Sequence, residues 1–308
     1  MKKRIEIIEV GPRDGLQNQS AILSTEDKVA MIEKLIDAGA RRMEVASFVN
    51  PARVPQMADA EGVIAGLPDR KDVTYIGLVL NARGVERAMR TKIDEVGAVA
   101  IATDSFGLRN QKQTWRESVE VSCDIIERAK KAGLRAQATI SVAFGCPFEG
   151  EVPLDRVIEM ARGIATAGPH EIAVADTVGV GVPSQVKEMI AALREAIPGM
   201  PLRCHFHNTR NTGLANAFAA AEMGVDRLDA SVGGIGGCPF APSATGNIGT
   251  EDLIYMLHRS GFETGYDLAK LNAMAPWLAG RLNLSGLPAM VSRTDPFPQS
   301  ARQQRAVT

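Results

Sequence analysis

The sequence lacks the broad positive charge and the long apolar segments of nucleic-acid-binding and membrane proteins. Its 308 residues carry a net charge of −1, with acidic and basic residues interspersed, so a nucleic acid partner is not expected. No apolar run approaches the roughly 20 residues that a membrane span requires. The stretch Ile5–Val10 is too short and too acidic for the core of a signal peptide. We therefore predict no membrane association.

Cysteine is scarce as well. The four cysteines, Cys123, Cys146, Cys204 and Cys238, have none of the short spacings of metal-binding cysteine motifs. This pattern is typical of free thiols in a reducing compartment. The sequence therefore predicts a cytoplasmic protein.

The chain has only four histidines, and two of them, His205 and His207, lie in one extended-looking run at 201–207. Because alternate side chains of a strand share a face, both imidazoles are expected to project the same way, as a pair of metal ligands would. Paired histidines also occur as ordinary hydrogen-bonded side chains, so the pair alone leaves both interpretations open. Cys204 alternates with them and is expected to face the opposite way, as a packing residue.

Glycines separate alternating strand and helix patterns. The clearest helix runs from Leu154 to Ala167, and Ser24, with Asp27 three positions on, is a plausible start for another. Four glycines follow amphipathic runs and precede short apolar ones, where helix ends are expected. They are Gly39, Gly133, Gly168 and Gly224.

Eight apolar runs are predicted to be strands, and several are nearly continuous, as in a parallel sheet covered on both faces. Eight such units in a chain somewhat above about 250 residues favour an α/β fold of the TIM (β/α)8 barrel type over an open doubly wound sheet. The predicted strands are Ile5–Val10, Arg42–Ser47, Val73–Val79, Val96–Thr103, Arg135–Val142, Glu171–Ala175, Leu202–His207 and Arg227–Val232.

The alternating pattern fades after Ala279. We expect a barrel domain with a short C-terminal helical extension over residues 1–285. Residues 286–308 are expected to form a loosely ordered tail, because the segment from Thr294 onward is rich in Pro, Gln, Arg and Ser.

Polar residues follow the predicted strands at the end where a barrel holds its active site. Random placement would scatter such residues, so their position predicts a functional rim. The candidates are Arg13, Asp14, Glu44, Asp104, Asp176, His205, His207, Cys238 and Asn247.

Several of these candidates have a plainer interpretation. Arg13 and Asp14 could form a surface ion pair, and Glu44 and Asp176 could be structural groups bonded to backbone or arginine. Cys238 could be a small buried apolar residue, the usual fate of a free cysteine. However, four glycines precede it and a proline follows, which suits a mobile lid that carries a reactive thiol.

Longer motifs then make the chain resemble the 3-hydroxy-3-methylglutaryl-CoA lyase family, which belongs to the metal-dependent TIM-barrel lyases and acyl-CoA condensing enzymes. The resemblance covers nearly the whole chain, from about Ile5 to about Ala279. The motifs that carry it are EVGPRDGLQN at 9–18, SFV at 47–49, VPQM at 54–57, GCPFEG at 145–150 and GGCPF at 236–240.

The resemblance implies a set of site residues and a cofactor. The metal ligands would be Asp14, His205, His207 and Asn247, with waters completing a six-coordinate Mg²⁺ or Mn²⁺. Mixed carboxylate, amide and imidazole ligation suits these ions.

The resemblance also implies roles in catalysis and substrate binding. Arg13 would bind the thioester oxygen, and Cys238 would act as an acid from the lid. Glu44 and Asp176 would support the proton chemistry, with His205 or Asp176 as the base. Gln17 would bind substrate, and Arg210 is a second predicted substrate-binding residue although it departs from the family pattern.

The activity implied is retro-Claisen cleavage of 3-hydroxy-3-methylglutaryl-CoA to acetyl-CoA and acetoacetate by a carbon–carbon lyase. This reaction belongs to leucine degradation and ketone body formation. The expected partners are an acyl-CoA substrate and a second copy of the chain in a homodimer.

Two segments depart from the family pattern. The run NTRNT at 208–212 replaces an expected acidic residue and Tyr-Gly pair, and TDSFGL at 103–108 replaces an expected Ser-Glu pair. Both border the acyl pocket, and Arg210 is an added cation there that suits a different carboxylate or faces solvent. The substrate is therefore left open between 3-hydroxy-3-methylglutaryl-CoA and a related 3-hydroxyacyl-CoA such as citramalyl-CoA.

Two further alternatives concern the class of protein. A condensing acyl-CoA synthase would run the bond formation in reverse, but the Gly-Gly-Cys-Pro loop at 236–239 is typical of lyases. A barrel that only binds an acyl-CoA or a metal is disfavoured because acid, base and metal-binding groups are all present.

Overall fold

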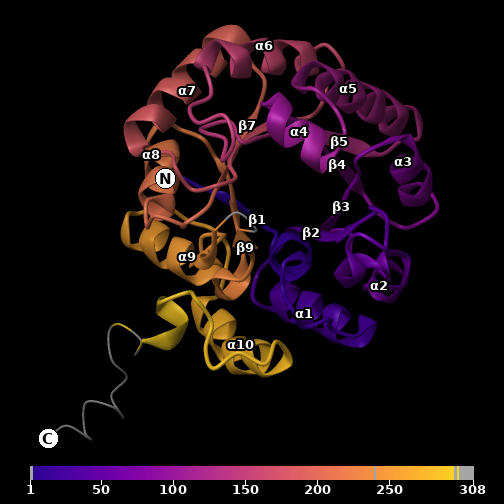
Figure 1. Ribbon diagram of the computed structural model, residues 1–308. Helices are drawn as coiled ribbons and strands as arrows, with labels where there is room; N and C mark the ends of the chain where they lie inside the picture. Colours follow the sequence, from indigo (N-terminus) through magenta and orange to yellow (C-terminus); the bar gives the residue numbers. More distant parts are fainter. Residues whose placement is uncertain (1–2, 239–240, 295–296, 298–308) are drawn as a thin grey trace, which may run out of the picture.

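The computed structural model of the chain describes residues 3–238, 241–294 and 297. Within them, eight parallel strands pair in chain order and close into a barrel, which Figure 1 shows surrounded by helices. Closure comes from β1 and β8, which pair from Glu6 with Arg227 to Glu9 with Ala230. The predicted TIM barrel is confirmed.

All eight predicted strands are present, with ends that differ by at most two residues from those predicted. The largest differences are at the C-terminal ends of β4 and β8, where helix α4 or a tight turn begins. The strands are β1 (Glu6–Glu9), β2 (Arg42–Ser47), β3 (Thr74–Leu78), β4 (Glu95–Ile101), β5 (Arg135–Ser141), β6 (Ile172–Asp176), β7 (Leu202–Phe206) and β8 (Arg227–Ala230).

Helices follow the strands, and most of them cover the outside of the barrel (Figure 1). They are α1 (Thr25–Asp37), α2 (Ala60–Gly66), α3 (Ala82–Ala88), α4 (Asp104–Asn110), α5 (Trp115–Lys131), α6 (Leu154–Ala165), α7 (Pro183–Ala196), α8 (Gly213–Glu222), α9 (Thr250–Arg259) and α10 (Leu268–Arg281). The short strands β9 (Gly237–Cys238) and β10 (Ala241–Thr245) pair antiparallel and were not predicted.

The start and end of α1 illustrate how the sequence sets the helix boundaries. The Ser24 hydroxyl accepts a hydrogen bond from the Asp27 backbone N–H at 3.1 Å, as predicted for an N-cap. Gly39 follows the helix with a φ of +111°, and a Cβ there would lie 2.4 Å from the Gly265 carbonyl oxygen. Only glycine fits this position, so the helix ends where the sequence predicts.

The interior of the barrel is polar at the end where the strands begin. Arg42 and Arg203, both buried, form ion pairs with the buried Glu171, and Arg42 also pairs with Glu95. The large apolar core lies instead between the strands and the surrounding helices. This arrangement explains why most strand sequences are nearly continuous apolar runs interrupted by single charged residues.

The C-terminal segment packs on the barrel beyond the last long helix. Helix α10 lies against α1 and α9. Leu287 and Ala289 are buried, and the backbone N–H groups of Met290 and Val291 donate to the Asp252 carboxylate. The predicted boundary at residue 285 stays a prediction, and residues 298–308 of the predicted tail lie outside the described residues. No helix in the described part of the chain combines the length and apolarity needed to cross a bilayer.

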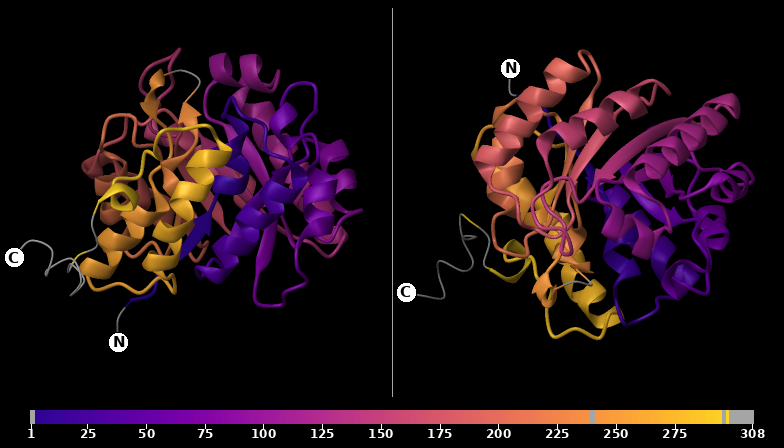
Figure 2. Two further views of the ribbon diagram at one scale, coloured as in Figure 1. Left: turned by 90° about the horizontal axis from the view of Figure 1, so that it is seen from below. Right: turned by 45° about the horizontal axis from the view of Figure 1, so that its top comes forward.

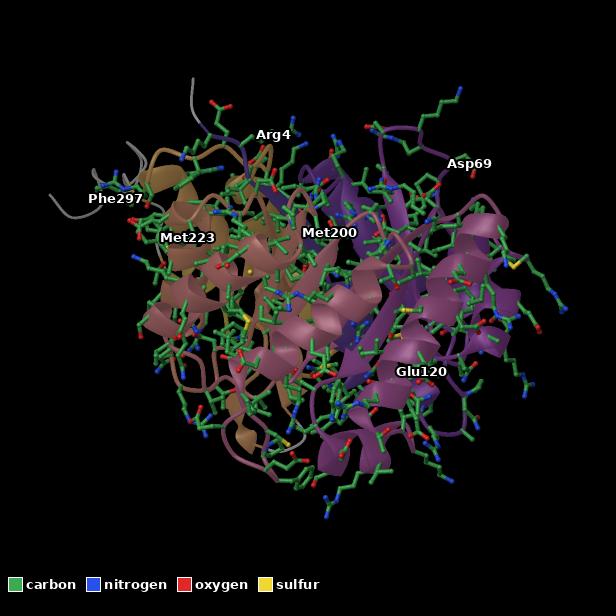
Figure 3. The ribbon with its side chains drawn as sticks, turned by 90° about the horizontal axis from the view of Figure 1, so that it is seen from above. Arg4, Asp69, Glu120, Met200, Met223 and Phe297 are labelled. Carbon is green, nitrogen blue, oxygen red and sulfur yellow. The ribbon has the colours of Figure 1, made fainter. Side chains whose placement is uncertain are left out.

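Different elements and residues lie at the two ends of the barrel. Figure 2 shows β9, β10 and α4 projecting from the same end, where the strands finish. Figure 3 shows Arg4 and Asp69, which precede β1 and β3, at the opposite end. The predicted functional residues follow the strands, so they belong to the end that carries α4.

Two buried carboxylates join the loops at this end. Glu9, the last residue of β1, accepts hydrogen bonds from the Gly11 and Val232 N–H groups and from the Thr250 hydroxyl. Glu251 accepts one from the backbone N–H of Gly233, the neighbour of Val232. Burial raises the pKa of Glu9 to about 7 and that of Glu251 to about 8. Glu9 therefore links the loops after β1 and β8, and Glu251 links the loop after β8 to the start of α9.

Glu9→Gln is expected to weaken the pH dependence of stability. Between the ordinary pKa of 4.5 and about 7, the folded protein binds the Glu9 proton more tightly than the unfolded chain. The free energy of unfolding contributed by Glu9 therefore falls as pH rises through this window. Urea unfolding at pH values from 5 to 8 should give a flatter profile for Glu9→Gln than for the unchanged protein. The exposed Glu33→Gln variant is the control, and identical slopes for all three proteins would contradict the assignment.

Candidate active site

Asp14, His205 and His207 converge at the mouth of the barrel. One potential ligand atom from each residue lies within 4.8 Å of the others. Asp14 is in the turn that follows β1, His205 is on β7, and His207 directly follows that strand. The imidazole rings are 5.1 Å apart, and Cys204 is buried in the apolar core, so the predicted alternation of faces is confirmed.

Asn247 joins this group from the segment that follows β10. Its Nδ2 donates to the Asp14 carboxylate at 2.8 Å and to the Ile235 carbonyl oxygen at 3.2 Å. Asn247 also forms an antiparallel bridge with His207. Gly236, with a φ of +111°, lies beside it, and a Cβ there would come within 2.5 Å of Asn247 Nδ2. The close approach of this loop to Asp14 therefore requires glycine.

The four residues fit a divalent cation. Asn247 Oδ1 and His207 Nδ1 are buried and have no hydrogen-bond partner among the residues that the structure describes. Buried polar atoms without partners are rare in folded proteins, and an ion that they coordinate would satisfy them. Carboxylate, amide and imidazole donors together suit Mg²⁺ or Mn²⁺.

Electrostatics prepare two of these side chains for ligation. Burial alone would raise the pKa of Asp14, but the charges of Arg13 and the two histidines lower it to about 2. Burial, together with the neighbouring His205, lowers the pKa of His207 to about 3. At neutral pH Asp14 is therefore ionised and His207 is neutral, the forms that bind a metal.

Arg13 lies beside the cluster and is held by two carboxylates. Its Nη1 donates to Asp14 Oδ1 at 2.7 Å, and its Nε donates to Glu44 Oε2 at 2.8 Å. The ion pair of the plainer interpretation is therefore present, but at 13% and 17% exposure its side chains are largely buried and not at the surface. Burial raises the pKa of Glu44, although Arg13 acts to lower it.

Arg13, Asp14, Glu44, His205 and His207 line a cavity of about 450 Å³. Its apolar lining comes from side chains on β3 and β4 and in the segments after β2 and β4, namely Val49, Val54, Leu78, Val99, Ile101 and Phe106. Gln17 lines the polar side, as expected of a substrate-binding residue, and its Oε1 is buried without a hydrogen-bond partner in the described residues. The exposed Arg53 and Arg109 add positive charge to the lining.

The structure does not bring Asp176 into this cavity. Its neighbours Ala175 and Thr177 line the cavity, but its own carboxylate accepts hydrogen bonds at 2.9 Å from the backbone N–H groups of Val180 and Gly181. The strand alternation directs Asp176 into its own loop, since it pairs with the outward-facing Phe206. This position matches the structural interpretation of Asp176.

Arg210 and Asp104 also lie away from the cavity lining. Arg210 donates to the carbonyl oxygens of Val178 and Gly179, both at 3.0 Å, so it supports the loop after β6. Asp104 accepts a hydrogen bond from the Trp115 N–H at the start of α5. Neither position is suited to bind the acid arm of a substrate in this cavity.

Cys238 has its backbone in β9, but its side chain lies outside the part of the structure that is described. Its predicted role as an acid on a lid therefore stays a prediction. The placement of β9 at the mouth of the barrel, next to the Gly236–Asn247 contact, is consistent with a loop that borders the cavity.

Sequence reasoning missed two residues that line the cavity, Arg203 and Asp229. The His205 Nδ1 lies 3.2 Å from Asp229 Oδ2. Burial acts to lower the pKa of His205, but the hydrogen bond and charge of Asp229 outweigh it and raise that pKa. Strand alternation gave a signal for Arg203, because it lies two positions before His205 on the same face.

Comparison with known proteins agrees with this geometry. The model of the HMGL-like family matches residues 4–277. The chain is 39% identical over 280 residues to a hydroxymethylglutaryl-CoA lyase of Bacillus subtilis, covering 91% of this chain and 94% of that one. It is 41% identical over 306 residues to an (R)-citramalyl-CoA lyase of Chloroflexus aurantiacus, covering 96% of each chain.

A solved structure extends the likeness to three dimensions. The HMG-CoA lyase of Acinetobacter baumannii, determined with coenzyme A and 3-methylmalate, superimposes with a TM-score of 0.90 at 36% identity, over 97% of this chain and 96% of that one. Family model, relatives and structure therefore agree over almost the entire length. The chain belongs to the HMGL-like family of carbon–carbon lyases.

Proposed function

We propose that this protein cleaves 3-hydroxy-3-methylglutaryl-CoA into acetyl-CoA and acetoacetate. The observation that carries the proposal is the contact between Arg13 and Asp14 at the mouth of the barrel, which puts a permanent cation beside a metal-binding cluster in one cavity. The family membership and the B. subtilis relative support this substrate. The reaction would belong to leucine degradation and ketone body formation.

The reaction has two chemical requirements. The tertiary hydroxyl must lose its proton, and the departing thioester enolate must carry negative charge while the carbon–carbon bond breaks. Asp14, His205, His207 and Asn247 would hold the divalent cation, Mg²⁺ or Mn²⁺. When bound, this ion would lower the pKa of the hydroxyl and orient it.

Arg13 meets the second requirement. Its guanidinium stays charged at any physiological pH and can place N–H donors on the thioester oxygen as charge develops there. Glu44 holds the Arg13 side chain from β2, so the cation need not reorganise during the reaction. Donors preorganised in this way stabilise the transition state more than the ground state.

Two proton transfers complete the cycle. His205, whose Nδ1 is paired with Asp229, is the proposed base for the hydroxyl proton. Cys238 is the proposed acid that delivers a proton to the enolate carbon and so forms acetyl-CoA. Both assignments rest on the family resemblance and on the position of these residues in the chain.

A second candidate substrate is citramalyl-CoA. The Chloroflexus relative, an (R)-citramalyl-CoA lyase, is similar over 96% of this chain, slightly more than the B. subtilis relative. Citramalyl-CoA has one methylene fewer between the hydroxylated carbon and the distal carboxylate, and its cleavage gives pyruvate with acetyl-CoA. A single methylene changes specificity by only about 10- to 200-fold, so both substrates fit the same chemistry.

Product analysis distinguishes the two substrates. The purified protein is incubated with Mg²⁺ and either acyl-CoA, and the products are identified by mass spectrometry. We expect acetyl-CoA together with acetoacetate from 3-hydroxy-3-methylglutaryl-CoA. Faster release of pyruvate from citramalyl-CoA would favour the second candidate. The absence of acetyl-CoA from both reactions would reject the lyase assignment.

Removal of the metal should abolish activity. Protein treated with a chelator is expected to lose turnover and to regain it with Mg²⁺ or Mn²⁺. Asn247→Ala removes one oxygen donor, so its Mn²⁺ affinity should fall by at least about tenfold, the lower limit for outer-shell changes. Asn272→Ala on α10 is the matched control and should bind Mn²⁺ normally. Full activity of the chelated protein would reject the metal site.

Arg13→Gln should lower kcat by about 10²- to 10³-fold, the effect of losing one charged donor to a developing oxyanion. Circular dichroism should report an intact fold, since glutamine can still hydrogen bond to Glu44. Arg70→Gln, which alters an exposed ion pair with Asp72, serves as the control. Near-normal turnover of Arg13→Gln would remove Arg13 from the mechanism.

A further inference from the structure

Arg203 lies one layer below His205 on the inner face of β7. It is 3% exposed, its two terminal nitrogen atoms donate hydrogen bonds, and its Nε forms an ion pair. The Nη1 atom donates to both oxygens of Asp229, at 2.9 and 3.1 Å. The Nη2 atom donates to Gln137 and to Thr139 on β5. Its position is therefore fixed by two other strands.

The third nitrogen completes this arrangement. Arg203 Nε lies 3.0 Å from Glu171 Oε1, directly before β6. Glu171 is in turn paired with Arg42 from β2. Partners from β5, β6 and β8 thus hold a single side chain on β7, and a buried guanidinium held on so many sides has one conformation.

Asp229 connects Arg203 to the metal cluster. It is buried, and its Oδ2 lies 3.2 Å from His205 Nδ1. With a proton on Nδ1, the His205 ring donates to Asp229 and presents the Nε2 lone pair to the cation site. Carboxylates in this position set both the tautomer and the orientation of metal-binding histidines.

The other histidine–carboxylate group in the described residues provides a contrast. Glu95, His170 and Glu171 also lie within reach of a common ion. However, Arg42 occupies this group, with Nη2 at 2.8 Å from both His170 Nε2 and Glu171. Here an arginine takes the place a cation would need. At the other end Arg203 donates to Asp229, and Asp229 rather than the arginine lies against His205 Nδ1.

We propose that Arg203 and Asp229 act as a pair of positioning residues for the metal site. Arg203 fixes the Asp229 carboxylate, and Asp229 fixes the His205 ring so that Nε2 faces Asp14 and His207. This inference rests on the proposed metal-dependent function but assigns roles to two residues that do not touch the ion. It predicts that metal affinity depends on a side chain buried one layer below the ligands.

The first test measures metal binding without turnover. Metal-free protein is titrated with Mn²⁺, and free Mn²⁺ is followed by electron paramagnetic resonance. Asp229→Ala should bind Mn²⁺ about 10- to 100-fold more weakly than the unchanged protein, the range for lost outer-shell partners. Asp229→Asn keeps an oxygen acceptor for Nδ1–H and should recover part of the affinity. Arg203→Lys should lie between the unchanged protein and Asp229→Ala.

Lys28→Met is the matched control, because it also removes a buried charge, the ion pair between Lys28 and Asp59, away from the cavity. It should leave Mn²⁺ affinity unchanged. Folded Asp229→Ala and Arg203→Lys proteins with normal affinity would overturn the proposal. If the unchanged protein binds no Mn²⁺, the proposed metal-dependent function fails instead.

The second test does not depend on a variant that folds. ¹⁵N nuclear magnetic resonance of the metal-free protein reports which nitrogen of His205 carries a proton. We expect the signal of a protonated, hydrogen-bonded Nδ1. A neutral ring protonated on Nε2 would overturn the proposal, whatever the result of the Mn²⁺ titration.

Discussion

The pairing of β1 with β8 is the constraint on which the site depends. It closes the barrel and brings the turn after β1, with Arg13 and Asp14, next to the segment after β8, with Asn247. These residues are more than 230 positions apart in the chain, yet Asn247 Nδ2 lies 2.8 Å from Asp14. Glu9 reinforces the closure by bonding to both loops. The candidate metal site thus forms where the two ends of the sheet meet.

The charged interior of the barrel provides rigidity below this site. Burying Arg42, Arg203, Glu95 and Glu171 costs desolvation energy, and the ion pairs offset it only because every partner is well placed. Such a network tolerates little displacement, since a shifted partner would leave a buried charge unpaired. His205, a proposed ligand, is attached to this network through Asp229. A rigid floor of this kind suits a site that must hold several ligands at fixed distances.

The fold and the clustering of Asp14, His205 and His207 at one end of the barrel could be predicted from the sequence because they depend on local patterns. Apolar runs, glycines at helix ends and polar residues after strands can all be recognised in a single sequence. The orientation of Asp176 was not readable, because the face it occupies depends on the register of β6 against β7, where it pairs with Phe206. Asp229 was overlooked within a predicted strand, and its role depends on contact with His205 from another strand. The pair β9 and β10 lies in a glycine-rich segment without strand periodicity.

Closure of the eight strands has a consequence for how the protein behaves at high concentration. Each strand of the barrel hydrogen bonds to a neighbour on both sides, so this sheet has no free edge. Open sheets expose such edges, where strands of other molecules can add and start aggregation. A cylinder removes that risk by geometry alone, without the charged or proline-containing edge strands on which open sheets rely.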